Sequence, residues 1–519
     1  MPLLLGIDVG TTNCKAAVFD QIGHMVGLCK TNTITHYDRD GRAWYEPDEM
    51  WTSVAHVVRE TLERIGGSAR IDGVSVASMG ESGVPIDANL NPIYPIISWF
   101  DSRSLPQSEM IDGIVGRERI FRITGLDNSP IFSVPKLMWI RENEPDVFAM
   151  TDKWLCMTDW IYLKLAGVIA TDYSIASRTM ALDIANHSWS TELLGAVGLD
   201  AGLFPSLVPS GTVIGHVTKE ASAQTGLAEG TPVVAGGHDH LCGSVASGIL
   251  QGRRIFDSSG TAESIHTVIS PELAPTDQFR GFRIGRYVDP EHMYIVGGLV
   301  SSGICVDWIM DRCASLVDWG EGDGSKLSYL EVMERAEATE PGARGLLFLP
   351  HLRGSGAPYW DPCSRGTFLG LSSVHTAPEM VRAVIEGLCF EVRGIVDALS
   401  GMMEQEVELL TVIGGGAQND FWQQTKSNIT GLPVEVPDIE EATAMGAALL
   451  AGVGIGAYQD IVDASSRTYR RKRTYLPDKD VKDFYDRLYS CYRQVYPAVR
   501  ELNHELQALP LEDSFNGRA

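Results

Sequence analysis

Apolar positions along the chain alternate between two spacings. Short runs such as residues 3–8, 74–77 and 409–413 are apolar at almost every position and lead into glycine or polar residues, as buried strands do. Residues 49–65 and 376–399 instead carry apolar side chains three or four positions apart, which predicts one buried helical face in each stretch. Strand-like and helix-like stretches alternate from end to end, so the sequence predicts an α/β fold.

Two hairpin-like stretches echo each other about half the chain apart. They read LLLGIDVGTTNCKAAVFD (residues 3–20) and RRIFDSSGTAESIHTVIS (residues 253–270). In each, a strand with an aspartate near its end, Asp8 or Asp257, leads into a Gly-Thr turn and a second strand. Successive backbone N–H groups in such a turn can form an anion-binding nest. The echo predicts two similar halves, residues 1–248 and 249–519, that together clamp a phosphate.

Charge, cysteine content and the lack of long apolar runs bear on the partners, the thiol state and the location expected for the protein. The 519 residues contain 42 Lys and Arg against 67 Asp and Glu, a net charge of −25, which argues against nucleic acid or an anionic membrane as partner. The nine cysteines are scattered without a CxxC pair, as expected for reduced thiols. Neither a signal peptide nor an apolar run of about 18 residues is evident, so we expect a cytoplasmic protein.

The segment GGHDHLCG places His238, Asp239 and His240 directly after a predicted strand. One interpretation is a metal site that uses all three side chains, as in a metal-dependent hydrolase. Successive strand residues point to opposite faces, however, so the three cannot easily reach one ion. The favoured interpretation is that Asp239 alone faces the ligand and accepts a proton from a substrate hydroxyl.

Other polar sets suggest where ligands would bind. Asp8 could hold Mg²⁺ through water, and the residues expected around phosphates are Thr11, Thr12, Asn13 and Lys15. A carboxylate and a guanidinium beside an indole suit a polyhydroxylated ligand, and the alternative interpretation is a surface salt bridge beside a core tryptophan. The candidate substrate-binding residues are Gly80, Glu81, Ser82, Trp99, Asp101 and Arg103.

The glycine run in VIGGGAQNDFWQQ (residues 412–424) would let a flat ligand lie on the backbone. The chain contains no GxxxxGK followed by Ser or Thr, and therefore no Walker A loop. It also has no GxGxxG after a strand, which disfavours a dinucleotide-dependent dehydrogenase.

Taken together and in this order, the motifs resemble the FGGY family of carbohydrate kinases, within the actin-like ATPase superfamily. GIDVGTTNCKAAVFD resembles the family's first phosphate motif, DSSGTAE the second, and GGGAQNDFW the adenosine motif. PVVAGGHDHLCGSVASG is similar to the segment that carries the catalytic aspartate, which falls on Asp239. SVPKLMWIREN and GTFLGLSSVHTAPEMVRAVIEG are similar to the two segments that define the family.

The resemblance implies two ribonuclease-H-like domains that flank a central cleft. An N-terminal domain (1–248) would bind the sugar, and a C-terminal domain (249–519), with a helical tail, would bind the nucleotide. ATP and Mg²⁺ are the implied cofactors, a sugar or polyol is the implied substrate, and a homodimer is possible. The resemblance places Gly260 and Thr261 at the transferred phosphate, and Gly415, Gly416 and Asn419 at the nucleotide. His240 would contact substrate beside Asp239.

The substrate loop departs from the better-known branches of this family. It reads Met79-Gly80-Glu81-Ser82, where xylulose kinases usually have Met-His-Gly and glycerol kinases Arg-Glu. YPIISWFDSR and GHD are most similar to the fuculokinase-like branch. Ketoses, such as xylulose or fuculose, and polyols therefore both remain candidate substrates. A catalytically silent sugar-binding relative is a further alternative.

Overall fold

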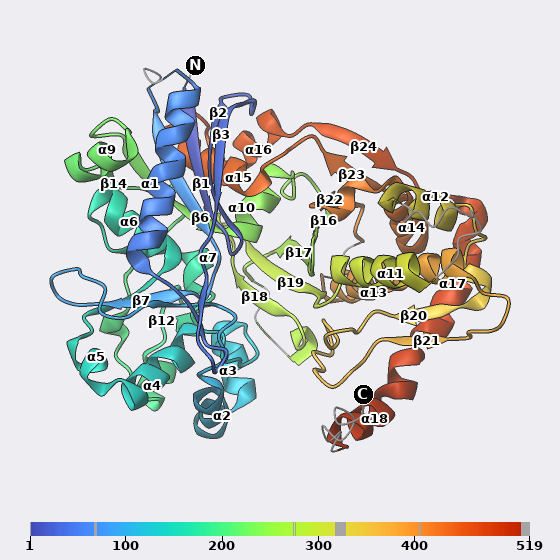
Figure 1. Cartoon of the computed structure of the whole chain (residues 1–519). Coiled ribbons are helices and arrows are strands. Elements are labelled where there is room, and N and C mark those ends of the chain that lie inside the picture. The colour runs from blue at the N-terminus through green and yellow to red at the C-terminus, as the bar shows by residue number, and fades with distance from the viewer. Residues whose placement is uncertain are drawn as a thin grey trace. The chain divides into compact units, whose positions relative to one another are not determined.

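A computed structural model describes residues 2–66, 70–272, 275, 277–316, 328–403 and 406–509 of the chain (Figure 1). Its contacts define two compact units, and each unit is assembled from three segments. Unit 1 comprises Met1–Gly252, Thr267–Ile295 and Asp438–Arg470, and unit 2 comprises Arg253–His266, Val296–Pro437 and Arg471–Ala519. Neither unit is thus one continuous segment of the chain.

The large sheet of unit 1 has the strand order β14-β15-β6-β1-β2-β3. Its strands are β1 (Leu3–Val9), β2 (Asn13–Asp20), β3 (Met25–Asn32), β6 (Gly73–Ser78), β14 (Val213–His216) and β15 (Pro232–His238). The three central strands β15, β6 and β1 are parallel, whereas β14, β2 and β3 pair antiparallel. Neighbouring parallel strands end at the same edge of a sheet. The residues that follow β15, β6 and β1 are therefore close together.

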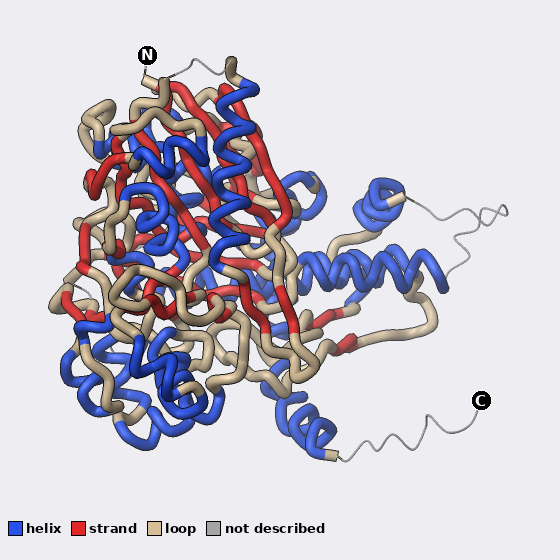
Figure 2. The backbone as a smooth tube through the Cα atoms, turned by 60° about the vertical axis from the view of Figure 1, so that its left-hand side comes forward, coloured by secondary structure: helices blue, strands red, loops and turns tan. Residues whose placement is uncertain are grey.

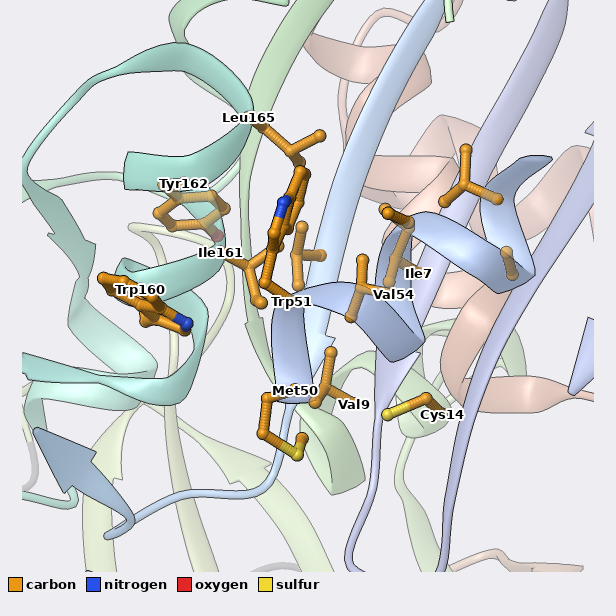
Figure 3. Close-up of a cluster of buried hydrophobic side chains, with 14 of the residues drawn as sticks. Ile7, Val9, Cys14, Met50, Trp51, Val54, Trp160, Ile161, Tyr162 and Leu165 are labelled. Carbon is orange, nitrogen blue, oxygen red and sulfur yellow. The ribbon is translucent and has the colours of Figure 1, made fainter. Parts of the chain in front are cut away.

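Helices cover this sheet and bury its apolar strands. They are α1 (Pro47–Arg64), α6 (Met157–Ala166), α10 (Asp239–Ala246) and α15 (Ala442–Gly454). Met50 and Trp51 of α1 belong to the same buried cluster as Ile7 and Val9 of β1 (Figure 3). Figure 2 shows the long strands of this unit beside one another, with helices packed along them. The helix predicted over residues 49–65 is confirmed as α1.

Helix α15 belongs to unit 1 although it comes from the last fifth of the chain. It packs directly on β1, where a Cβ atom at Gly6 would lie 1.8 Å from the carbonyl oxygen of Ala444. A Cβ atom at Gly446 would similarly lie 1.9 Å from the carbonyl oxygen of Cys242 in α10. Glycine is needed at both positions because the backbones themselves are in contact.

A second, smaller sheet of unit 1 has the order β4-β5-β8-β7-β9. Its strands are β4 (His36–Tyr37), β5 (Ala43–Tyr45), β7 (Gly83–Ile86), β8 (Ile96–Ile97) and β9 (Lys153–Cys156). The helices between β8 and β9 are α2 (Leu105–Ile114), α3 (Arg117–Thr124), α4 (Ser133–Asn143) and α5 (Pro145–Met150). Shorter elements are β10 (Ala170–Asp172), α7 (Tyr173–Ala176), β11 (Leu182–Asp183), β12 (Ser188–Trp189), α8 (Thr191–Ala196), β13 (Ser206–Val208), α9 (Lys219–Thr225), β18 (Arg283–Arg286) and α16 (Ile461–Thr468).

Unit 2 is also built on a sheet. Its strands are β16 (Arg254–Ser259), β22 (Leu409–Ile413), β23 (Val434–Pro437) and β24 (Arg471–Tyr475), with the start of β17 (Glu263–Ile269) and the end of β19 (Met293–Leu299). A hairpin pairs β20 (Leu347–Leu349) with β21 (Thr367–Leu369). The helices are α11 (Gly303–Leu316), α12 (Tyr329–Glu337), α13 (Ala377–Met403), α14 (Asp420–Thr430), α17 (Lys479–Tyr492) and α18 (Val495–Ala508).

Helix α13 is the second helix predicted from spacing. The carboxylate of Glu379 accepts the backbone N–H of Thr376 at 3.0 Å just before the helix begins. The predicted helical tail is present as α17 and α18, while residues 510–519 lie outside the described part of the chain. Among the described helices, none has the length and apolar content needed to cross a bilayer.

Candidate functional site

In unit 1, one sheet edge gathers Asp8, Gly80 and Asp239. Asp8 lies near the end of β1, Gly80 follows β6, and Asp239 follows β15 and begins α10. The strand registers place Val9 and His238 on either side of Ser78. Residues from three distant parts of the sequence therefore meet because parallel strands end at the same edge.

The carboxylate of Asp239 is oriented by its two neighbours. Its Oδ1 accepts the backbone N–H of His240 at 2.6 Å and lies 3.0 Å from Nδ1 of His238, and 23% of the side chain is exposed. Burial alone would raise the pKa of Asp239, but the imidazoles of His240 and His238 and this N–H outweigh it, so the pKa falls well below its usual range. The Asp239 carboxylate is therefore ionised and partly accessible, as a proton acceptor has to be.

Asp8 has the character of a cation ligand. Burial raises the pKa of Asp8 to about 7; Lys15, whose Nζ lies 3.8 Å from Oδ2, opposes this rise, and Asp239 and Glu441 add to it. Lys15 is itself held by Glu441 at 2.6 Å. Carboxylates thus outnumber the nearby ammonium group, and carboxylate oxygen is the donor that Mg²⁺ prefers. The residues around Asp8 fit a divalent cation.

The turn after β1 presents the predicted phosphate residues. It is closed by a hydrogen bond from the backbone N–H of Gly10 to the carbonyl of Asn13. Thr12 is exposed and Thr11 is half-buried. The hydroxyl of Thr11 accepts the indole N–H of Trp99 at 2.9 Å, which brings a predicted phosphate residue to a predicted substrate residue.

The substrate loop after β6 is held by buried cations. Glu81 adopts φ 61°, a strained conformation for a non-glycine residue, and its carboxylate accepts hydrogen bonds from the guanidinium of Arg178. Burial would raise the pKa of Glu81, but Arg178 and its other cationic neighbours lower it. A Cβ atom at Gly80 would lie 2.9 Å from the His238 ring and 3.2 Å from Arg178, so these side chains fill the space beside the loop.

Ser82 and Trp99 meet through a hydrogen bond from the Trp99 backbone N–H to the Ser82 hydroxyl. The Trp99 side chain is among the exposed large apolar groups and can offer a ring face to a ligand. Asp101 and Arg103 instead pair bidentately with each other, with side chains 0% and 5% exposed, and Asp101 also accepts the backbone N–H of Ala43. Both Asp101 and Arg103 are thus engaged in holding their own loop.

Three residues around this site had no assigned role in the sequence analysis: Lys136, Arg178 and Glu441. Lys136 is fully buried, and its Nζ donates to the carbonyl oxygens of Glu81 and Ser98, which ties the substrate loop to the Trp99 loop. A single charge within the apolar run SVPKLMWI was the available signal. Arg178 and Glu441 lie in segments without a recognisable pattern.

In unit 2, the second Gly-Thr turn joins β16 to β17. Gly260 and Thr261 are exposed, and their carbonyl oxygens accept backbone N–H groups of Gly303 and Ser302 at the start of α11. Hydrogen bonds to the start of α11 therefore hold the backbone of this turn in place, while Gly260 and Thr261 remain exposed.

The predicted nucleotide residues lie at the end of β22 and the start of α14. Gly415 is exposed and Gly416 is half-buried. The side-chain oxygen of Asn419 accepts the backbone N–H of Trp422 as a helix cap, and its amide donates to the Tyr329 hydroxyl at 3.0 Å. A Cβ atom at Gly416 would lie 2.4 Å from the Ser259 hydroxyl, which fixes this strand-to-helix connection beside β16.

Comparisons with known proteins agree with this arrangement. Residues 3–246 match the model of the N-terminal domain of the FGGY family of carbohydrate kinases, and residues 258–455 match that of its C-terminal domain. A xylulose kinase of Staphylococcus epidermidis is 27% identical, with 97% of this chain and 98% of that protein covered. A gluconokinase of Bacillus subtilis is 29% identical, with coverage of 90% and 91%.

A solved structure of a xylulose kinase from Rhodospirillum rubrum is 25% identical and superposes with a TM-score of 0.87, covering 97% of this chain and all of that one. The predicted two-domain α/β fold class is thereby confirmed. The comparisons do not favour a metal-dependent hydrolase or a silent sugar-binding protein. Sequence motifs, fold and relatives agree, and the chain belongs to the FGGY family of carbohydrate kinases.

Proposed function

We propose that the enzyme transfers the γ-phosphoryl group of ATP to a hydroxyl of a small sugar, polyol or sugar acid. The observation that carries the proposal is the carboxylate of Asp239, which is ionised, partly exposed and located at the same sheet edge as Asp8. A phosphoryl acceptor needs a group that takes its proton as the oxygen attacks, and Asp239 is suited to this role.

The other residues of unit 1 prepare the attack. Asp8 would hold Mg²⁺, which would neutralise phosphate charge when bound. Lys15, kept in place by Glu441, adds a positive charge beside the turn. Thr11, Thr12 and Asn13 would bind phosphate oxygens through the turn between β1 and β2. His238 and His240 keep the Asp239 carboxylate ionised.

In unit 2, Gly260 and Thr261 would stabilise the transferred group. Their turn is braced by α11, and the Gly260 N–H donates to the carbonyl of Ala262 within the turn, so the exposed Thr261 is preorganised and need not be ordered during the reaction. Gly415, Gly416 and Asn419 would contact the nucleotide where β22 leads into α14.

The acceptor would bind beside Glu81 and Trp99. Glu81 is held by Arg178, and Trp99 exposes an indole face that suits the apolar side of a sugar. Relatives include both xylulose kinases and gluconokinases, so ketoses and aldonic acids are the first acceptors to compare. A panel that also includes fuculose, glycerol and other polyols, assayed by acceptor-dependent ADP release, identifies the substrate.

The test of the proposal is Asp239→Asn. This variant should lose acceptor-dependent ADP release almost completely while it still binds ATP in a calorimetric titration. Asp152→Asn, which removes an exposed carboxylate of the same unit, should keep wild-type turnover. Retention of more than a few per cent of turnover in Asp239→Asn contradicts the assignment of Asp239 as the base.

The proposal also covers the cellular location and the oligomeric state of the enzyme. A cytoplasmic location would supply ATP and keep the thiols reduced, and the cysteines that the structure describes are free. A homodimer belongs to the same proposal, and light scattering of the purified protein tests it.

A further inference from the structure

A cluster of three metal-ligating side chains lies in unit 2, apart from every residue assigned to phosphoryl transfer. Asp361 and Cys363 belong to the connection between β20 and β21, and His504 belongs to α18. One carboxylate oxygen, one sulfur and one imidazole nitrogen from these residues all lie within 4.8 Å of one another. Asp361 and Cys363 are close in sequence, whereas His504 comes 143 residues after Asp361.

Asp361 is held firmly in this cluster. Its Oδ1 accepts the backbone N–H of Cys363 at 2.9 Å, and its own backbone N–H donates to the Ser355 hydroxyl at 2.8 Å. Its Oδ2 accepts the Tyr496 hydroxyl at 3.0 Å and lies 2.8 Å from Nε2 of His504. Hydrogen bonds of this kind fix the orientation of carboxylate ligands in metal sites.

The donor set selects a class of ion. Thiolate and imidazole together are typical ligands of Zn²⁺, whereas Mg²⁺ favours oxygen alone. Ligands about 2.0–2.3 Å from Zn²⁺ in a tetrahedron are about 3.3–3.8 Å apart. Small rotations would bring the three atoms to such separations, and the His504 side chain, which is 43% exposed, has room to move.

We propose that Asp361, Cys363 and His504 bind a Zn²⁺-type divalent transition metal ion, with water in the fourth position. The ion would link α18 to the β20–β21 connection and so fasten the C-terminal helix onto unit 2. Because Cys363 must lose its proton to bind, uptake of the metal releases a proton and becomes tighter as pH rises.

The test uses the full-length, tag-free enzyme, freed of metal by a chelator and kept in reducing buffer that contains Mg²⁺. Titration with Co²⁺ should give one equivalent of binding, with visible d–d bands of a tetrahedral ion and a thiolate-to-cobalt charge-transfer band. Zn²⁺ should displace Co²⁺ and raise the melting temperature above its value in the Mg²⁺ buffer alone, and additional Mg²⁺ should not displace Co²⁺.

Matched variants separate this site from other thiols. Cys363→Ser should lose the charge-transfer band, whereas Cys491→Ser, which removes an exposed cysteine of α17, should keep it. Tyr496→Phe, which removes a hydrogen bond to Asp361, should weaken Zn²⁺ binding by about 10–100-fold. Loss of Cys363 or His504 as a ligand should weaken it at least as much.

Alkylation of the wild-type protein keeps the test decisive if a variant does not fold. Zn²⁺ should slow iodoacetamide labelling of Cys363 and leave that of Cys491 unchanged. The proposal is overturned if Co²⁺ gives no charge-transfer band, if Cys363→Ser binds Zn²⁺ as tightly as the wild type, or if Zn²⁺ leaves Cys363 labelling unchanged. Sugar phosphorylation can succeed or fail independently of each result.

Discussion

The two Gly-Thr hairpins are similar, but their aspartates differ by one position relative to the turn, since Asp8 lies two residues before Gly10 and Asp257 three before Gly260. In the first, the pairs next to the turn are Val9 with Cys14 and then Asp8 with Lys15. The corresponding pairs of the second hairpin are Ser259 with Glu263, then Ser258 with Ser264, then Asp257 with Ile265. Ser258 therefore occupies the position of Asp8, and Asp257 occupies that of the apolar Ile7.

This shift of one residue changes the role of the aspartate, because neighbouring strand residues face opposite sides of the sheet. Asp8 forms an ion pair with Lys15 in which the two side chains keep 10% and 23% of their surface exposed. Asp257 is fully buried, and so is its partner Lys426 from α14. The first aspartate remains partly accessible, as its proposed role as a cation ligand requires, whereas the second is part of the core.

A buried triad surrounds Asp257. Lys426 Nζ binds the carboxylate of Asp257 and, at 2.7 Å, that of Glu263, which also accepts the Ser302 hydroxyl. Burial and Glu263 raise the pKa of Asp257 well above its usual value, against the effect of Lys426. Burial also acts to raise the pKa of Glu263, but Lys426 lowers it. One proton on Asp257 leaves the triad neutral, so it braces the second turn without excess charge.

The strongest test of this comparison removes the lysine that pairs with each of the two aspartates. Lys426→Met should lower the free energy of unfolding by about 3–5 kcal/mol, because an ionised carboxylate stays buried without its partner. Lys15→Met should cost about 1 kcal/mol or less, since that ion pair is partly solvated. Urea unfolding followed by tryptophan fluorescence measures both. Equal losses would contradict the conclusion that the Asp8 ion pair is partly solvated and the Asp257 ion pair is fully buried.

The next test concerns the residues that share one structural position, Asp8 and Ser258. Asp8→Asn should lower kcat about 10²–10³-fold, since it removes the proposed cation ligand while the fold is kept. Ser258→Ala should change kcat less than about threefold, because no catalytic role falls on it. Acceptor-dependent ADP release at saturating ATP gives both values. A comparable loss in Ser258→Ala would show that the second hairpin also supplies a ligand.

The two turn threonines provide a subtler comparison. Thr261 is exposed, so Thr261→Ala should lower kcat about 10²-fold by removing a donor to the transferred group. Thr11 already accepts the Trp99 indole N–H, so Thr11→Ala should have a smaller effect on kcat, about tenfold, and should also alter Trp99 emission. An unchanged kcat in Thr261→Ala removes that residue from the proposed mechanism.

The fold was largely predictable because it follows from local patterns. Apolar runs identified β1 and β22, and helical periodicity identified α13. The offset between Asp8 and Asp257 is already present in the sequence, because Asp8 stands two positions before Gly10 and Asp257 three before Gly260. What local patterns do not encode is the set of residues that surround each aspartate, Lys15 with Glu441 in one case and Lys426 in the other.

Only those residues of the candidate site that lie in recognisable motifs could be predicted from the sequence. Asp239 and the turn residues stood out in the sequence, but Arg178 and Lys136 did not. Their roles arise from long-range contacts with the Glu81 loop, and no local pattern encodes such contacts. Asp101 and Arg103 stay predicted ligand-binding residues, and their hydrogen bonds in the structure mainly join each other.

The mildest expected effect is a pH dependence of Mg²⁺ binding that only the first hairpin should show. Burial raises the pKa of Asp8 from an ordinary 3.8 to about 7, so the folded protein holds this proton more tightly than the unfolded chain does. Asp8 therefore favours folding at low pH, and this contribution is lost as pH rises from about 4 to about 7. Mg²⁺ must displace the same proton, so its affinity should fall about tenfold per pH unit below 7.

Calorimetric Mg²⁺ titrations in buffers of different ionisation enthalpy measure this proton release. At pH 6 the wild type should release close to one proton per ion, whereas Asp8→Asn should release almost none. Asp257→Asn should behave as the wild type, because that carboxyl group is fully buried and bound to Lys426. If Asp257→Asn also abolished proton release, both hairpins would have to contribute to one cation site, and the one-residue offset would not separate their roles.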